Sequence, residues 1–192
     1  MNKILVVSGP SGVGKTTLCE HLLRLERRIK PGITATTRKP RPGEKDGRDY
    51  HFLTIKGFEK GIRSKKFVEY TRLFGNYYGT PIESLNDVFR HGKYPLLRVD
   101  VRGAKALKQK GFKGVYIFIL PPCLPAGRPD VKTLKQRLVK RQSRESLAEI
   151  NKRIKRARVE MRYSKDYEFH VVNDRITRAV GEMRQIVKKN LY

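Results

Sequence analysis

Residues 9–16, with the sequence GPSGVGKT, have the residue types and spacing that bind phosphate. They fit the pattern G-x-x-x-x-G-K-[ST] of the phosphate-binding P-loop. Small residues let backbone N–H groups converge on phosphate oxygens, and the start of a following helix adds positive potential. Lys15 is then expected to reach the terminal phosphates of a nucleoside triphosphate, and the Thr16 hydroxyl to bind Mg²⁺. The residues expected to bind this nucleotide are Gly9, Pro10, Ser11, Gly12, Val13, Gly14, Lys15, Thr16 and Thr17.

The motif needs a strand before it and a helix after it. The apolar run at residues 4–7 is typical of a short buried strand, and the leucines at 18, 22, 23 and 25 form an imperfect helical stripe. An ordinary glycine-rich turn would also match so short a pattern. The flanking strand and helix favour the phosphate-binding interpretation.

A second set of basic residues follows at Arg38 and Arg41, in the segment ITATTRKPRPGE at residues 33–44. The alternating β-branched residues predict the start of a strand, and two prolines end it. The segment is too rich in proline for a helix. Two guanidinium groups held here could grip one phosphate bidentately. A solvated basic loop explains this segment equally well.

Two acidic residues lie in otherwise apolar surroundings. Glu69 interrupts the apolar run at residues 67–70, which suggests that its carboxylate points into a site. Asp100 falls near the end of a predicted core strand at residues 95–101, where an acid that binds magnesium or substrate is expected beside a P-loop. Tyr77 and Tyr78 could donate to a phosphate or stack on a base, although packing at a rim is the commoner role.

The order of elements predicts an α/β fold. Further strands are expected at residues 114–120 and 169–172, and a charged helix end at residues 26–30. Helices are expected at residues 58–64, 84–91, 102–108 and 133–141, then along a basic amphipathic stretch from Leu147 to Met161, and last from Ile176 to Val187. This order favours a parallel sheet with helices on both faces and a nucleotide at the carboxyl ends of its strands.

Composition narrows the class of protein. The 192 residues suggest one domain with an inserted lobe or lid. The net charge of +26 implies attraction to polyanions, and it admits incidental binding of nucleic acid. Cys19 and Cys123 form no disulfide or metal framework, which favours a reducing, cytoplasmic setting. No apolar stretch approaches the length of a membrane span or a signal peptide, so no membrane partner is expected.

The chain closely resembles guanylate kinase, which phosphorylates GMP with ATP. The similarity runs almost end to end, through the blocks GPSGVGKTT, TTRKPRPGE, DGRDYHF, FVEY, FGNYYGTP and VVND in the order found in that family. The resemblance implies one domain of three parts. These are a P-loop kinase core at residues 1–32, 83–123 and 159–192, a GMP-binding lobe at residues 33–82, and a helical lid at residues 124–158.

The resemblance also implies roles for individual residues. Glu69 matches the residue that reads guanine, and the expected substrates are GMP, dGMP and ATP, with Mg²⁺. The residues matched to substrate binding are Thr34, Arg38, Arg41, Tyr50, Glu69, Tyr78, Thr80 and Asp100. The residues matched to catalysis are Lys15, Arg38, Arg137, Arg141 and Arg153. For Arg38 and Arg41, the resemblance favours the phosphate-binding interpretation.

Three departures from the family pattern keep other functions open. The strand that usually reads L-D-I-D has Arg98 at its first acidic position, the segment at residues 123–134 is longer than usual, and the positive charge exceeds what the reaction needs. A catalytically weak binding module with the same fold is one alternative. The others are a related ribose bisphosphate phosphokinase, which the intact TTRKPRPGE and YYGTP blocks disfavour, and a nucleic-acid-binding protein, for which no reading motif is present.

Overall fold

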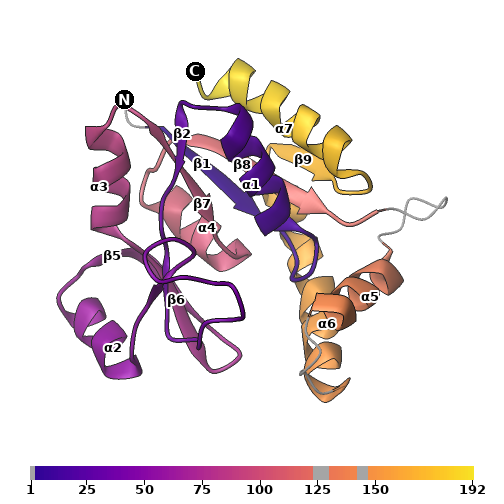
Figure 1. Ribbon diagram of the computed structural model, residues 1–192, viewed down its shortest axis with the longest axis horizontal. Coiled ribbons are helices and arrows are strands. Elements are labelled where there is room, and N and C mark those ends of the chain that lie inside the picture. The colour runs from indigo at the N-terminus through magenta and orange to yellow at the C-terminus, as the bar shows by residue number, and fades with distance from the viewer. Residues whose placement is uncertain (1–2, 123–129, 142–146) are drawn as a thin grey trace.

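A computed structural model describes residues 3–122, 130–141 and 147–192 of the chain (Figure 1). Most of the lengthened segment noted at residues 123–134 lies outside the described residues. The described strands form two sheets, and the larger one runs through the centre of the molecule. Among the described residues, no helix combines the length and the apolar character that a membrane crossing requires.

The central sheet confirms the predicted parallel α/β fold. Its strands lie in the order β2 (Ile29–Pro31), β7 (Tyr94–Arg98), β1 (Ile4–Ser8), β8 (Gly114–Leu120) and β9 (Phe169–Val172). All neighbouring pairs are parallel. Strand β1 is buried along its whole length, as expected for a strand covered by helices on both faces.

Helices cover both faces of this sheet. They are α1 (Lys15–Leu25) and α7 (Ile176–Asn190) on one face, and α3 (Ile82–Arg90) and α4 (Val101–Gln109) on the other. Because successive side chains of a strand point to opposite faces, neighbouring residues of β1 enter different cores. Leu5 belongs to the cluster that contains Met183 of α7. Val6 belongs to the cluster that contains Leu107 of α4.

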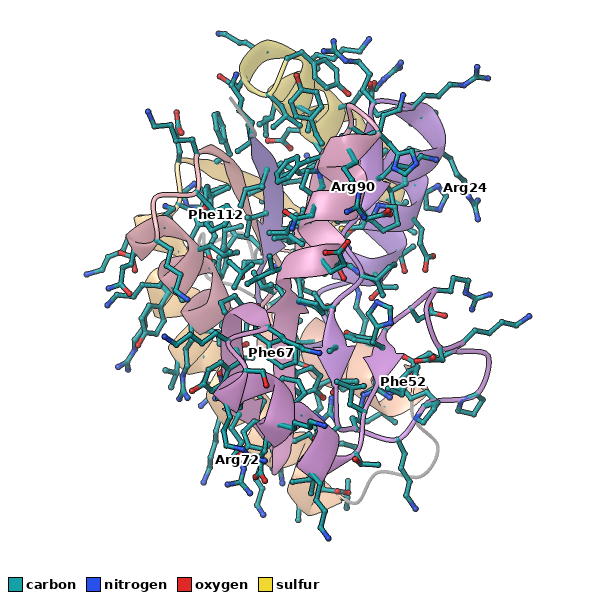
Figure 2. All side chains as sticks on the ribbon, turned by 90° about the vertical axis from the view of Figure 1, so that its left-hand side faces the viewer. Arg24, Phe52, Phe67, Arg72, Arg90 and Phe112 are labelled. Carbon is teal, nitrogen blue, oxygen red and sulfur yellow. The ribbon has the colours of Figure 1, made fainter. Side chains whose placement is uncertain are left out.

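A smaller sheet and one helix form a lobe below the central sheet in the views of Figures 1 and 2. Its strands lie in the order β4 (His51–Phe52), β3 (Ala35–Thr36), β6 (Asn76–Pro81) and β5 (Phe67–Leu73), and its helix is α2 (Ile55–Arg63). Phe58 of α2 is fully buried, with its ring stacked on Phe67 at 4.3 Å and on Tyr77 at 5.1 Å between centroids. This aromatic stack joins the helix to both long strands of the lobe.

A pair of basic helices, α5 (Val131–Arg141) and α6 (Leu147–Arg162), lies across from the lobe. The 3₁₀ turn η1 (Tyr163–Asp166) connects α6 to β9. Ile150 and Ala157 of α6 are buried, which agrees with the predicted apolar face of this helix, but Leu147 at its start is exposed and Glu160 near its end is buried. Arg137 of α5 donates to the backbone oxygens of Val13 and Asn173, so that the helix pair is attached beside the P-loop.

The prediction of a charged helix end at residues 26–30 is wrong. Helix α1 ends at Leu25, and Ile29 begins edge strand β2, where it pairs with Tyr94 of β7. Ile29 is buried, whereas Lys30 and Pro31 are exposed, which suits the edge of a sheet. The burial of Ile29 and the backbone pairing of β2 with β7 therefore favour a strand here, despite the charged composition of the segment.

Several predicted element boundaries also shift. Strand β7 ends at Arg98, three residues earlier than expected, because the Asp100 carboxylate accepts a hydrogen bond from the backbone N–H of Gly103 and caps α4. Helix α2 begins at Ile55, because the Thr54 side chain caps it in the same way. Helix α3 begins directly after Pro81, two residues earlier than expected.

Candidate active site

The P-loop connects β1 to α1 through three glycines with positive φ. Gly9 has a φ of +137°, and a Cβ atom there would lie 2.5 Å from the backbone oxygen of Ile119 in β8. Gly14 has a φ of +96° and immediately precedes α1, where its missing side chain leaves room for the amide of Asn173. The third, Gly12, has a φ of +84°. Side chains larger than hydrogen are excluded by space and by backbone conformation, so the loop keeps its backbone N–H groups accessible.

Lys15 and Thr16 occupy the first turn of α1 and line a cleft at the carboxyl ends of β1 and β7. The Lys15 ammonium folds over the loop and donates to the backbone oxygens of Gly9 at 2.5 Å and Pro10 at 3.0 Å. It is thus held next to the loop that a phosphate would enter. Thr17 is exposed and does not line this cleft.

The cleft brings together residues from the core, the lobe and α6. The predicted site residues that line it are Gly9, Ser11, Gly12, Gly14, Lys15, Thr16, Thr34, Arg38, Arg41, Tyr50, Glu69, Tyr78, Asp100 and Arg153. Pro10, Val13, Thr17, Thr80 and Arg137 are absent from its lining, although Thr80 contacts a residue that lines it. The Arg141 side chain lies outside the described residues.

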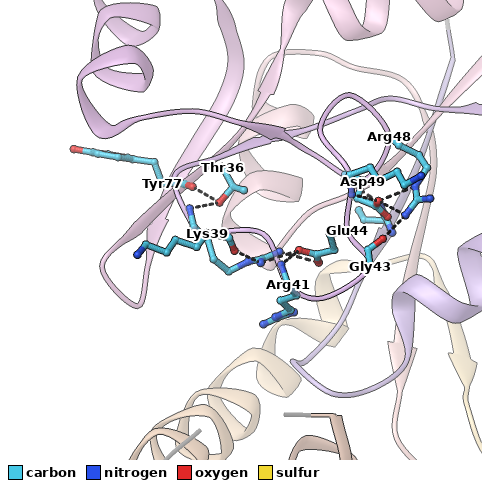
Figure 3. A network of polar contacts seen from close by, with 11 residues as sticks. Thr36, Lys39, Arg41, Gly43, Glu44, Arg48, Asp49 and Tyr77 are labelled. Carbon is cyan, nitrogen blue, oxygen red and sulfur yellow. Dashed lines mark hydrogen bonds and ion pairs between the residues drawn. The ribbon is translucent and has the colours of Figure 1, made fainter. Parts of the chain in front are cut away.

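On the lobe side of the cleft, Arg38 is held in place by the carboxylate of Glu44, which is labelled in the polar network of Figure 3. Its guanidinium bonds both oxygens of Glu44, at 3.0 Å and 2.9 Å. Burial lowers the pKa of Arg38, but the hydrogen bonds and charge of Glu44 outweigh it and hold the pKa above its ordinary value. The same contacts with Arg38, together with the backbone N–H of Arg41, overcome the effect of burial on Glu44 and lower its pKa. Both partners therefore stay charged.

Two tyrosines stand next to this pair. The rings of Tyr50 and Tyr78 meet edge to face at 6.4 Å, and the Arg38 guanidinium lies 5.4 Å from the centre of the Tyr50 ring. Arg41 lines the same part of the cleft. Two guanidiniums and two phenols thus face a common space, which is a donor set suited to a phosphate.

Glu69 lies deeper, at the base of the cleft, with only 4% of its surface exposed. The Thr80 hydroxyl donates to one carboxylate oxygen at 2.6 Å, and the other oxygen lies against Gly103, where a Cβ atom would approach to 2.6 Å. Burial raises the pKa of Glu69 to about 7, and the hydrogen bond from Thr80 only partly opposes this. A buried carboxylate that meets an incoming base can accept hydrogen bonds from it.

An ion-pair cluster lies between Glu69 and the P-loop, and two of its members, Arg156 and Glu160, were not predicted from the sequence. Arg156 of α6 bonds Asp100 at 3.2 Å and Glu160 at 2.8 Å, and both Arg156 and Glu160 line the cleft. Burial raises the pKa of Glu160, against the nearby charges of Lys15 and Arg156. Arg156 and Glu160 are four residues apart on one helix, a spacing that favours an ion pair. The many other basic residues in this stretch concealed that signal.

Helix α6 contacts two further parts of the cleft, the P-loop and the lobe. Arg153 donates to the Ser11 hydroxyl of the P-loop at 3.4 Å, and its guanidinium also lies 5.3 Å from the ring centre of Phe74 in the lobe. Phe74, in the turn between β5 and β6, lies below Arg156 as well, at 5.9 Å. Helix α6 therefore contacts the P-loop and the lobe at the same time.

The residues present fit a magnesium ion that arrives with a nucleotide. Mg²⁺ keeps several waters and takes few protein ligands beside phosphate oxygens. The Thr16 side chain lines the cleft beside the P-loop and can supply such a ligand. Within the part of the chain that the structure describes, no group of three or more His, Cys, Asp or Glu side chains could hold a metal by itself.

Comparisons with known proteins agree with this geometry. The family model described as guanylate kinase matches residues 1–190. Guanylate kinase from Clostridium perfringens strain 13 is 42% identical over 184 residues, which cover 96% of this chain and 82% of that protein. Guanylate kinase from Clostridioides difficile strain 630 is 40% identical, with 96% and 86% covered. The crystal structure of guanylate kinase from Anaplasma phagocytophilum superimposes with a TM-score of 0.77 at 30% identity, covering 98% of this chain and 85% of that one.

The raised pKa of Glu69 predicts a pH-dependent cost to stability. Between its ordinary pKa of 4.5 and its folded pKa of about 7, the folded state binds more protons than the unfolded state, so stability falls as pH rises. Glu69→Gln removes this titration. The free energy of unfolding of the variant, relative to the unsubstituted protein, should therefore rise by up to about 3 kcal/mol across this window.

Urea denaturation at half-unit steps from pH 4.5 to 7.5 measures this difference. Glu20→Gln, which changes an exposed carboxyl on α1, is the matched control. A difference between Glu69→Gln and the unsubstituted protein that stays constant with pH would contradict the assigned environment of Glu69.

Proposed function

Because the chain belongs to the guanylate kinase family, we propose that its cleft transfers the terminal phosphoryl group of ATP to GMP. It is a nucleoside monophosphate kinase with ATP as its co-substrate. The observation that carries the assignment of GMP is the buried Glu69 carboxylate in a cleft whose opposite wall is the P-loop. The same cleft is lined by the side chains proposed to bind the acceptor phosphate, which are Arg38, Arg41, Tyr50 and Tyr78.

Glu69 is the proposed reader of guanine. Guanine presents two donors, N1–H and the exocyclic amine, which one carboxylate can accept together, whereas adenine lacks this pair. Thr80 orients one Glu69 oxygen by its hydrogen bond, and buried Thr34 lines the same part of the cleft. A base without the matching donors would leave the buried carboxylate unpaired, which makes discrimination strong.

The acceptor phosphate is proposed to bind between Arg38, Arg41, Tyr50 and Tyr78. Glu44 holds Arg38 at a fixed position, so little side-chain freedom is lost when the phosphate binds. These contacts are to base and phosphate alone. Because dGMP keeps the same base and phosphate, we expect it to be accepted as well.

The donor phosphates are proposed to lie on the P-loop amides and Lys15, with Arg137 and Arg153 nearby on α5 and α6. Two anionic nucleotides must meet in line, so positioning and charge neutralisation carry this type of reaction. Mg²⁺ held by Thr16 and the phosphates would supply further neutralisation. The acceptor is itself a phosphate oxygen, and it hardly requires a general base.

Water must be kept from the transferring phosphoryl group, because it would compete with GMP as acceptor. The contacts of Arg153 with Ser11 and with the Phe74 ring join the lid, the P-loop and the lobe around the cleft. We propose that these parts close further over the two substrates, which would exclude water and complete the set of phosphate-binding side chains.

Lys15→Met tests the phosphoryl-transfer role of the P-loop. The substitution removes the ammonium beside the donor phosphates, and kcat for GMP-dependent ADP release should fall by about 100-fold or more. A coupled ADP-release assay measures the rate, and Lys189→Met, at an exposed position of α7, is the control. Unchanged turnover by Lys15→Met would refute the assignment, provided that the variant unfolds at the same temperature as the unsubstituted protein.

Glu69→Gln tests base recognition separately. Its amide can accept only one of the two guanine donors, and the ratio of kcat/KM for GMP to that for AMP should drop by about 10-fold or more. The same assay, run with either acceptor, gives the ratio. Equal preference in the variant and the unsubstituted protein would rule out the carboxylate as the reader of guanine.

A further inference from the structure

We propose that Arg98 is a further binding residue for the phosphate of the acceptor nucleotide, beside Arg38 and Arg41. This inference rests on the proposed function and deepens it. It assigns to Arg98 the recognition of a phosphate monoester, and with it a preference for a nucleotide over the corresponding nucleoside.

The fold delivers Arg98 to the cleft. It is the last residue of β7 and is paired with Val7 of β1, two residues before the P-loop begins. Because the two strands are parallel, their carboxyl ends open on the same edge of the sheet. Arg98 is half-buried there and lines the cleft together with Lys15 and Thr16.

The guanidinium extends from the core toward the lobe. Its Nη2 donates to the backbone oxygen of Asp49 at 3.3 Å, and Asp49 directly precedes Tyr50, one of the proposed phosphate-binding residues. On the core side, burial raises the pKa of the Cys19 thiol in α1 to about 12, against the opposing charge of nearby Arg98. Arg98 thus stands between α1 and the loop that holds the acceptor phosphate.

No carboxylate bonds Arg98 among the described residues, although its positive charge acts on the nearby Asp49 carboxylate and helps to lower the pKa of that acid. Its one hydrogen bond there, to Asp49, is long and goes to a neutral carbonyl. Arg38, by contrast, is paired with Glu44, and Arg156 is paired with two acids. A guanidinium has five donors, and withdrawing it from water with most of these donors unbonded costs free energy. A bound anion offsets that cost.

The position of Arg98 identifies the anion as the acceptor phosphate. The loop that leads to Tyr50 brings the lobe to the guanidinium, whereas the donor phosphates would lie across the P-loop, where the Lys15 ammonium bonds the loop carbonyls. A planar guanidinium binds two oxygens of one phosphate in a fixed geometry. Phosphate binding at Arg98 would then draw the lobe and the core together.

The test compares the binding of GMP with that of guanosine, which has the same base and sugar but no phosphate. Titration calorimetry without ATP gives both affinities. Arg98→Gln should weaken GMP binding by about 10-fold or more, the effect of a lost charged hydrogen bond, and leave guanosine binding unchanged. Arg98→Lys keeps the charge without the planar fork and should show a smaller loss, also confined to GMP.

Arg102→Gln is the matched control, because Arg102 carries the same charge four residues away, is exposed on α4 and does not line the cleft. An equal loss of GMP affinity in this control would mean that only the general positive field acts, and would overturn the proposal. Equal losses for GMP and guanosine in Arg98→Gln would also overturn it, because Arg98 would then only position the lobe through Asp49. Unchanged GMP binding in both Arg98 variants would overturn it as well.

Failure of the proposed function itself gives a different result. In that case the unsubstituted protein would show neither GMP binding nor GMP-dependent ADP release, before any variant is compared. If the unsubstituted protein binds and phosphorylates GMP, the Arg98 variants decide the role of that residue alone.

Discussion

The close contact between Gly9 and the backbone oxygen of Ile119 is the constraint on which the rest of the site depends. Only a residue without a Cβ atom lets the loop lie this near to β8. That position lets the loop turn from β1 into α1 and places Lys15 in the first helical turn. The carboxyl ends of the parallel strands β1 and β7 then open beside the same loop, so that Asp100 faces it across the cleft.

Around this loop, the cleft is organised by pairing of opposite charges. Arg38 and Arg156 are each held by buried or half-buried acids, which fixes their positions before any nucleotide binds. Glu69 differs, because burial raises its pKa to about 7 and no cation bonds it among the described residues. We therefore interpret Arg38 as a phosphate-binding residue that Glu44 holds in position, and Glu69 as the reader of a base. The large net charge of +26 is not needed for this local arrangement.

The positions of residues in contiguous motifs could be predicted from the sequence. Pairings that depend only on how distant segments pack could not. The P-loop was found because its glycines, strand and helix follow one another in the chain. Glu69 was found because an acid among apolar residues is unusual. The pairing of Arg156 with Asp100 joins residues 56 positions apart, and nothing local marks it. Strand β2 was missed because only one of its residues, Ile29, is buried.

Selection of GMP as the phosphoryl acceptor by this cleft is tested most directly by one comparison of acceptors. The unsubstituted protein is given ATP and Mg²⁺ with GMP, AMP or ribose 1,5-bisphosphate at equal concentration, and the release of ADP is followed. We predict that GMP supports the fastest release and that AMP is poorer by about 100-fold or more, since the wrong base leaves the buried carboxylate unpaired. Faster release with AMP or with ribose 1,5-bisphosphate, or no ADP formed with GMP, would contradict the account.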